Sequence, residues 1–143
     1  MKVKNLLKTK GKDVVSIDAG SSVEDAIRLM NDKKISALIV AENSNTVGLF
    51  TERDVVKCYV ATSGKSFKDI AIKDAMTTNL IVAEQNDDIS EIMCVMIEKN
   101  IRHLPVVEKA RVIGMLSIRD IVQTQVSKLT SEIHYLKDYI TSR

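Results

Sequence analysis

The sequence predicts an α/β (α+β) protein made of two tandem β-α-β-β-α repeats, which pack as one pseudo-two-fold unit, and a long C-terminal helix. Three observations lead to this prediction. A segment of the chain recurs later in constant register, each copy carries the same order of strand and helix patterns, and the chain ends in a heptad pattern. The 143 residues, 45% hydrophobic and 28% charged, suffice for such a fold.

The internal repeat is clearest around two glycine-led segments. Gly114 follows Gly48 by 66 positions, and Asp120 follows Asp54 by the same 66. The offset also pairs apolar positions upstream without a gap, and a constant register over some forty residues indicates a tandem duplication. We therefore expect a first repeat at 1–66, a second at 67–124 and a helical extension at 125–143.

Each half has the same predicted elements. A short apolar run predicts a strand, a polar cap follows, and apolar residues at spacings of three and four predict a helix. Two strands around a polar turn come next, and a second helix begins at Glu52 or Ile118. One such unit of about sixty residues is marginal as a lone core, so two copies should pack sheet to sheet. The expected strands are 14–17, 37–41, 47–51, 80–83, 103–107 and 112–117.

The last helix runs beyond what the repeat needs. Its apolar residues recur with spacings of 4, 3, 4, 3 and 4, which is a heptad a/d pattern. As a helix, the 26 residues at 118–143 would extend about 39 Å. The pattern favours a partner helix in a homodimer over packing on its own repeats. The apolar residues are Val122, Val126, Leu129, Ile133, Leu136 and Ile140.

Charge and composition argue against several classes of protein. There are 21 basic and 19 acidic residues, a net charge of +2, whereas dedicated nucleic-acid or membrane-surface binders carry a large single-sign excess. Aromatic residues make up 3% and tryptophan is absent, so a base-stacking platform is not expected. A nucleic-acid-binding arm remains an alternative for the basic N-terminus, whose lysines are Lys2, Lys4, Lys8, Lys10 and Lys12.

Cellular location is inferred from cysteines and hydropathy. Cys58 and Cys94 are too few for a disulfide framework and fit a reducing compartment. No apolar run approaches the roughly 20 residues that span a bilayer, and no signal-peptide core follows the N-terminus. The expectation is a cytoplasmic protein without membrane contact.

The paired segments carry a family resemblance. Gly-Leu-Phe-Thr51-Glu-Arg-Asp54 and Gly-Met-Leu-Ser117-Ile-Arg-Asp120 resemble the signature of CBS domains, the modules named after cystathionine β-synthase. The segment 101–107 is similar to the family's strand after its long helix, and 73–77 resembles its entry segment. The resemblance covers about residues 3–123 and implies a stand-alone CBS pair, also called a Bateman module, with two clefts between the repeats.

The resemblance also implies a function and a homodimer through the CBS faces. The clefts of this family commonly bind AMP, ADP, ATP or S-adenosylmethionine, so Asp54 and Asp120 would accept hydrogen bonds from a ribose. The residues suit this use, because a glycine lets a strand approach a ligand closely and a hydroxyl residue stands where a helix N-terminus favours phosphate. The expected phosphate contacts are Thr51, Arg53, Ser117, Arg119, Arg102 and His103. The expected adenine-pocket residues are Val15, Ser16, Ala37, Thr77, Ile81, Val82 and Pro105.

The same spacing has a second interpretation. Thr51-x-x-Asp54 and Ser117-x-x-Asp120 also fit a helix capping box, in which the carboxylate binds the helix backbone and no ligand. The two halves differ as well, since Arg102 and His103 correspond to Ser36 and Ala37 of the first repeat. The first cleft therefore lacks part of the phosphate contacts expected at the second, and asymmetric occupancy is one expected outcome.

Catalysis is not expected from this sequence. His103 and His134 lack metal-ligand spacing, and no cysteine or serine lies in a nucleophile motif with a base. The leading hypothesis is a non-catalytic regulatory module that binds adenosyl nucleotides, with no metal and no catalytic cofactor, and acts on an unidentified regulated protein. The alternatives are a dimerisation scaffold with degenerate clefts and a nucleic-acid-binding regulator.

Overall fold

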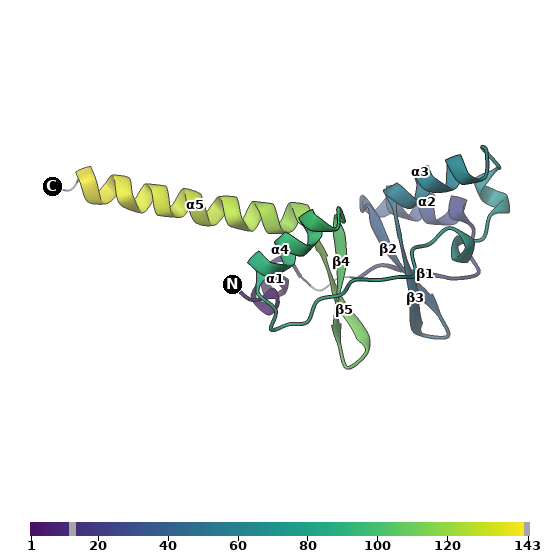
Figure 1. Ribbon diagram of the computed structural model, residues 1–143, viewed down its shortest axis with the longest axis horizontal. Coiled ribbons are helices and arrows are strands. Elements are labelled where there is room, and N and C mark those ends of the chain that lie inside the picture. Colours follow the sequence, from purple (N-terminus) through teal and green to yellow (C-terminus); the bar gives the residue numbers. More distant parts are fainter. Residues whose placement is uncertain (12–13, 142–143) are drawn as a thin grey trace.

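The computed structural model describes residues 1–11 and 14–141, and its first repeat contains a three-stranded sheet with two helices on one face (Figure 1). Strand order is β1-β2-β3, with β1 parallel to β2 and β2 antiparallel to β3. The elements are β1 (Ser16–Asp18), α2 (Val23–Lys33), β2 (Ala37–Glu42), β3 (Asn45–Thr51) and α3 (Glu52–Ala61).

The second repeat has the same plan with a shorter sheet. Strands β4 and β5 form an antiparallel pair, and Ala83 makes a parallel bridge to Val106 where the first repeat has β1. The predicted strand at 80–83 is thus reduced to one bridge. The elements are the 3-10 turns η1 (Phe67–Asp69) and η2 (Ile72–Asp74), then α4 (Ile89–Glu98), β4 (His103–Glu108), β5 (Arg111–Ser117) and α5 (Ile118–Thr141).

The 66-residue offset holds in the register of the hairpins. Leu38 faces Phe50 in the first repeat, and Leu104 faces Leu116 in the second. The strand register shifts at the equivalent point of both hairpins. The shift lies between Val40 and Ala41 in the first repeat and between Val106 and Val107 in the second. The turn of each hairpin contains two residues with positive φ. Asparagine, as at Asn43, adopts this backbone conformation more readily than most residues. The predicted duplication is therefore confirmed in three dimensions.

Three apolar clusters are formed by the described residues. One fills the first repeat beneath α2 and includes Phe50, and one fills the second repeat beneath α4 and includes Met96. A third joins the two sheets, since Ile39 and Leu49 of the first repeat pack with Met115 of the second. The predicted sheet-to-sheet packing of the repeats is thus present.

An N-terminal helix, α1 (Val3–Lys10), was not predicted. Leu6 and Leu7 are buried in the core of the second repeat, and the Val3 amide donates to the Asp87 carbonyl at 2.9 Å. Conversely, Ile72 packs in the core of the first repeat. The expected division at residue 66 follows the sequence repeat, whereas in space each core includes a segment from the other side of that division.

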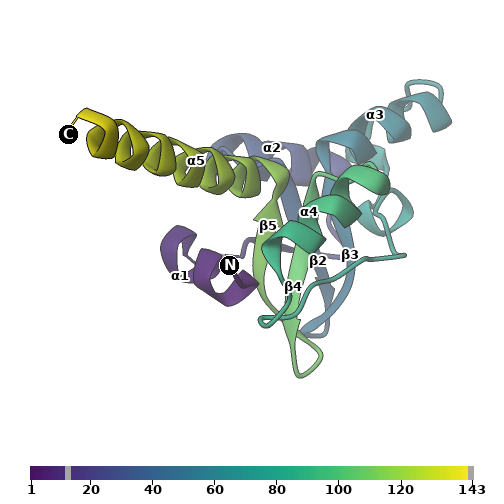
Figure 2. The same ribbon diagram turned by 60° about the vertical axis from the view of Figure 1, so that its left-hand side comes forward.

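Helix α5 projects from the body of the molecule (Figures 1 and 2). Its first turns contact α1, α4 and β5, where Ile121 is buried. Beyond them the helix continues to Thr141, while Ser142 and Arg143 lie outside the described residues. Its six a/d side chains are between 47% and 69% exposed, so they do not pack on their own repeats. No helix in the described part of the chain is both long and apolar enough to cross a membrane.

Candidate functional site

A cleft of about 840 Å³ lies between the repeats, and we call it the Asp120 cleft. It combines the start of α5 and the strands β4 and β5 with α2, β2 and α3 of the first repeat. Its lining is Lys10, Val14, Val15, Ile27, Met30, Asn31, Lys34, Ile35, Ser36, Ala37, Glu52, Val55, His103, Met115, Ser117, Arg119 and Asp120.

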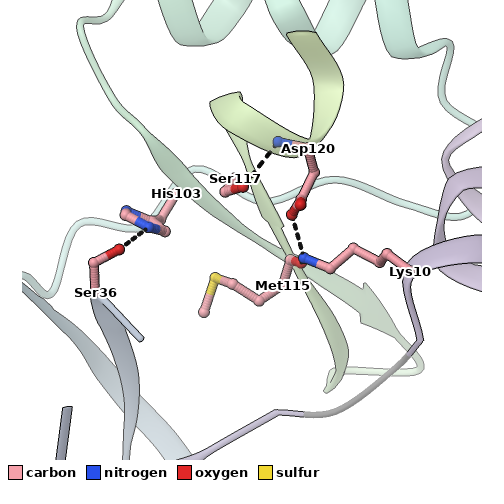
Figure 3. A network of polar contacts seen from close by, with 6 residues as sticks. All are labelled: Lys10, Ser36, His103, Met115, Ser117 and Asp120. Carbon is pink, nitrogen blue, oxygen red and sulfur yellow. Dashed lines mark hydrogen bonds and ion pairs between the residues drawn. The ribbon is translucent and has the colours of Figure 1, made fainter. Parts of the chain in front are cut away.

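Asp120 lies in the first turn of α5 and is held by a lysine from the N-terminal helix (Figure 3). The Lys10 Nζ is 2.5 Å from Asp120 Oδ2 and also donates to the Met115 carbonyl at 2.5 Å. The Asp120 amide donates to Ser117 Oγ at 3.1 Å, which caps the helix. The carboxylate therefore faces the cleft with a cation already bound to it.

The environment of Asp120 favours its charged form. Burial raises the pKa of this carboxyl, but the hydrogen bonds from Lys10 and Ser117 and the Lys10 charge lower it by more, so the pKa lies below the ordinary aspartate value. Both side chains of the pair are partly exposed, at 27% for Lys10 and 28% for Asp120. A ligand hydroxyl that approaches from solvent thus meets an ionised acceptor.

His103 bridges the two repeats at the cleft. Its Nε2 lies 2.9 Å from Ser36 Oγ, and the ring is half-buried (Figure 3). Burial lowers the pKa of His103 more than the nearby Glu52 charge raises it. The neutral ring is therefore favoured, which makes His103 a hydrogen-bonding group of the cleft and not a fixed cation.

The cleft suits an amphipathic, anionic ligand. Val15, Ala37 and Met115 supply apolar surface, while Lys34 at the end of α2 and Arg119 in the first turn of α5 supply positive charge. A volume of about 300–1,000 Å³ and an apolar lining with few polar groups are typical of small-molecule sites. A helix start with nearby cations is a setting that favours phosphate.

The equivalent motif of the first repeat is built differently. Asp54 is 4% exposed, and its Oδ2 accepts the Thr51 amide at 2.9 Å and the Thr51 hydroxyl at 3.3 Å. Its Oδ1 accepts the Thr77 hydroxyl at 2.9 Å. Both oxygens are thus bonded inside the protein, in the capping-box arrangement that was the second interpretation of the sequence.

The glycines of the two motifs also face different neighbours. A Cβ at Gly48 would lie 2.5 Å from Met76 Sδ and 2.9 Å from the Thr77 carbonyl, so the segment after η2 lies directly on β3. The Leu49 amide donates to that carbonyl at 2.9 Å. At Gly114 the neighbour is the end of the Leu7 side chain, at 2.8 Å. In both repeats the glycine admits a protein segment, and no ligand is needed to explain it.

The structure brings together only part of the predicted site. The residues that line the Asp120 cleft are Val15, Ala37, His103, Ser117, Arg119 and Asp120. Those placed outside it are Ser16, Thr51, Arg53, Asp54, Thr77, Ile81, Val82, Arg102 and Pro105.

Several of the residues outside the cleft already have protein partners. The Arg53 side chain donates to the Asn100 carbonyl, whereas Arg102 is bonded through its backbone, where its carbonyl accepts the Ile118 amide at 2.8 Å. Pro105 is buried in β4, where its carbonyl accepts the Ala83 amide at 2.9 Å. These contacts tie the repeats and their strands together.

Lys10, Lys34 and Ser36 line the cleft but were missed as site residues. Lys10 belongs to the basic N-terminus, and its helical pattern with Leu6 and Leu7 was the available signal that this segment folds onto the protein. Lys2, Lys4 and Lys8 are exposed, and Lys12 lies outside the described residues. No group of three metal-ligating side chains occurs in the described ranges.

Comparison with known proteins identifies the family. The CBS domain profile matches residues 3–61 and 72–127, which correspond to the two repeats. The chain therefore belongs to the CBS-domain family. The mitochondrial CBS domain-containing protein CBSX3 of Arabidopsis thaliana is 30% identical over 96% of this chain and 71% of its own length.

Solved structures share the same fold. The CBS-domain protein ATU1752 of Agrobacterium tumefaciens is 34% identical, with a TM-score of 0.83 over 87% of this chain and 99% of its own. The CBS domain pair of protein MJ0100, solved in complex with 5′-methylthioadenosine and S-adenosyl-L-methionine, is 25% identical, with a TM-score of 0.77 over 90% of this chain and 98% of its own. The fold is thus that of a CBS pair.

Proposed function

We propose that this chain is a non-catalytic regulatory module that binds one adenosyl compound per chain in the Asp120 cleft. The observation that carries the proposal is the position of the Asp120 carboxylate, ionised and partly exposed, in a cleft of about 840 Å³ between the repeats. The structure of the MJ0100 pair with two adenosyl compounds supports this class of ligand.

Each part of the ligand has a matching part of the cleft. Asp120 accepts the ribose hydroxyls, and the apolar wall formed by Val15 and Ala37 receives the adenine ring. Phosphates or another charged substituent lie near Ser117 and Arg119 at the start of α5. Charge-assisted hydrogen bonds of this kind contribute roughly 1.5–3 kcal/mol each.

Binding must change the contact of Lys10. Its ammonium occupies Asp120 Oδ2, where the ribose would bind, so the ligand displaces Lys10 or uses it as a phosphate contact. Because Lys10 is the last residue of α1 and Asp120 lies in the first turn of α5, this exchange acts on both helices. A ligand that favours one arrangement shifts the population toward it, which is how the module would signal to a partner protein.

The Asp54 carboxylate is proposed to have a structural role and to bind no ligand. With both oxygens bonded to Thr51 or Thr77 and 4% of the residue exposed, Asp54 stabilises α3 and its neighbouring segment and is not accessible to a ribose. The expected stoichiometry is therefore one ligand per chain. The candidate ligands are the cytoplasmic compounds AMP, ADP, ATP and S-adenosylmethionine.

Isothermal titration with these four compounds tests the proposal. We expect binding of at least one of them at a ratio of one per chain, and a loss of affinity of roughly 10–100-fold in Asp120→Asn. The matched control is Glu98→Gln, which neutralises an exposed carboxylate on α4 outside the cleft. Equal affinity in Asp120→Asn and the parent would refute the assignment, and silence for all four compounds would favour the scaffold alternative.

A further inference from the structure

The exposed face of α5 has the composition of a two-stranded coiled coil. In heptad notation Val126, Ile133 and Ile140 occupy a positions, which are all β-branched. The d positions are Val122, Leu129 and Leu136. β-Branched residues at a with leucine at d favour a parallel pair of helices over larger bundles. This a/d face is 47–69% exposed along a helix that projects from the repeats.

The side of α5 opposite the a/d face is polar and does not form a second apolar surface for a partner helix. The α5 residues that line the pocket between α5 and α1 are polar, and they include Ser127, Lys128 and Ser131. These occupy b, c and f positions, so the helix presents its polar side to its own chain and its apolar side to solvent. A helix with this distribution buries its apolar side only against another molecule.

The charges that flank the a/d face match a second copy in one orientation. In a parallel pair, a g residue of one helix lies beside the e residue five positions later on the other helix. Glu132 is at g and Lys137 at e, so two Glu–Lys pairs form by symmetry. In an antiparallel pair g faces g and e faces e, so Glu132 and Lys137 of the two chains could not pair with each other at these positions.

We infer that α5 forms a parallel, in-register two-stranded coiled coil with α5 of a second copy, with Glu132 of each chain beside Lys137 of the other. Both modules then lie at the N-terminal end of the coiled coil. The inference stands on α5 alone and does not depend on the nature of any ligand of the Asp120 cleft.

Sedimentation velocity of the full chain tests whether a second copy covers the a/d face of α5. We expect a dimer for the parent, a monomer for Leu129→Asp and a dimer for the control Ser131→Asp, whose f position points away from the partner. A parent that sediments as a monomer at tens of micromolar would overturn the inference. A dimer in Leu129→Asp would overturn it as well, because the dimer would then use another surface.

Charge reversal and cross-linking test the orientation. Glu132→Lys and Lys137→Glu should each weaken the dimer about tenfold, and the double variant should regain the parent affinity; unchanged single variants indicate an antiparallel pair and overturn the inference. In a Cys94→Ser background, Ile140→Cys should form an intermolecular disulfide, because equivalent a residues meet in a parallel pair. Ser131→Cys is the matched control, and equal cross-linking in both would refute the register.

Discussion

Asp54 and Asp120 occupy equivalent positions of the two repeats, yet their carboxylates lie in different surroundings. Asp54 is 4% exposed and accepts hydrogen bonds from Thr51 and Thr77. Asp120 faces the cleft and is paired with Lys10 at 2.5 Å. One duplicated motif thus supplies a buried structural acceptor in one half of the molecule and an accessible, charged acceptor in the other.

Replacing Asp54 should cost stability. Asp54→Ala leaves the Thr51 amide and the Thr77 hydroxyl without their acceptor in a buried place, which should lower the free energy of unfolding by about 2 kcal/mol. Urea denaturation followed by circular dichroism measures this loss. The matched variant Asp120→Ala, at a partly exposed site, should lose less than 1 kcal/mol, and an equal loss in both variants would contradict the assigned roles.

The two motif glycines provide a second comparison. Gly48→Ala places a Cβ 2.9 Å from the Thr77 backbone oxygen, which is held by the Leu49 amide and cannot move without breaking that bond. We expect a loss of about 1–3 kcal/mol from this overpacking. Gly114→Ala meets only the end of the Leu7 side chain, which can change rotamer, so its loss in the same urea assay should be smaller.

His103 should make stability depend on pH near neutrality. Its folded-state pKa is lowered by burial, so the unfolded chain takes up the proton first as the pH falls below the ordinary histidine value of about 6.5. The folded state therefore loses stability from about pH 6.5 downward, until the folded-state pKa is passed. Urea midpoints between pH 8 and 5 should drop more steeply in the parent than in His103→Gln. The control His134→Gln, at an exposed position, should behave like the parent.

Lys10 should discriminate between uncharged and phosphorylated ligands. Lys10→Met removes the cation that occupies Asp120 Oδ2, so adenosine no longer competes with it, whereas AMP also loses a positive charge near its phosphate. The affinity ratio of adenosine to AMP should therefore rise severalfold in titrations. Carboxyl NMR should show the Asp120 pKa rising toward the ordinary aspartate value in this variant. An unchanged ratio would exclude Lys10 from the binding site.

The repeat, the strand pairing and the start of α5 could be predicted from sequence because they depend on a constant offset and on local periodicity. The offset predicts that the two hairpins share one register, and they do, since Leu38 faces Phe50 and Leu104 faces Leu116. The different surroundings of Asp54 and Asp120 could not be predicted in this way, because they depend on Thr77 and Lys10, which come from segments outside the two motifs. The N-terminal helix was missed since its lysines dominate a segment with only three buried apolar residues.

The packing of α1 sets an order of events during synthesis. Leu7 lies against Gly114, and the Val3 amide is bonded to the Asp87 carbonyl, so α1 packs against segments that are synthesised about a hundred residues later. At 5–20 residues per second, α1 waits roughly 5–20 seconds for its partners. During that interval its leucines are exposed to solvent and to chaperones. The second repeat closes only after β5 has emerged from the ribosome.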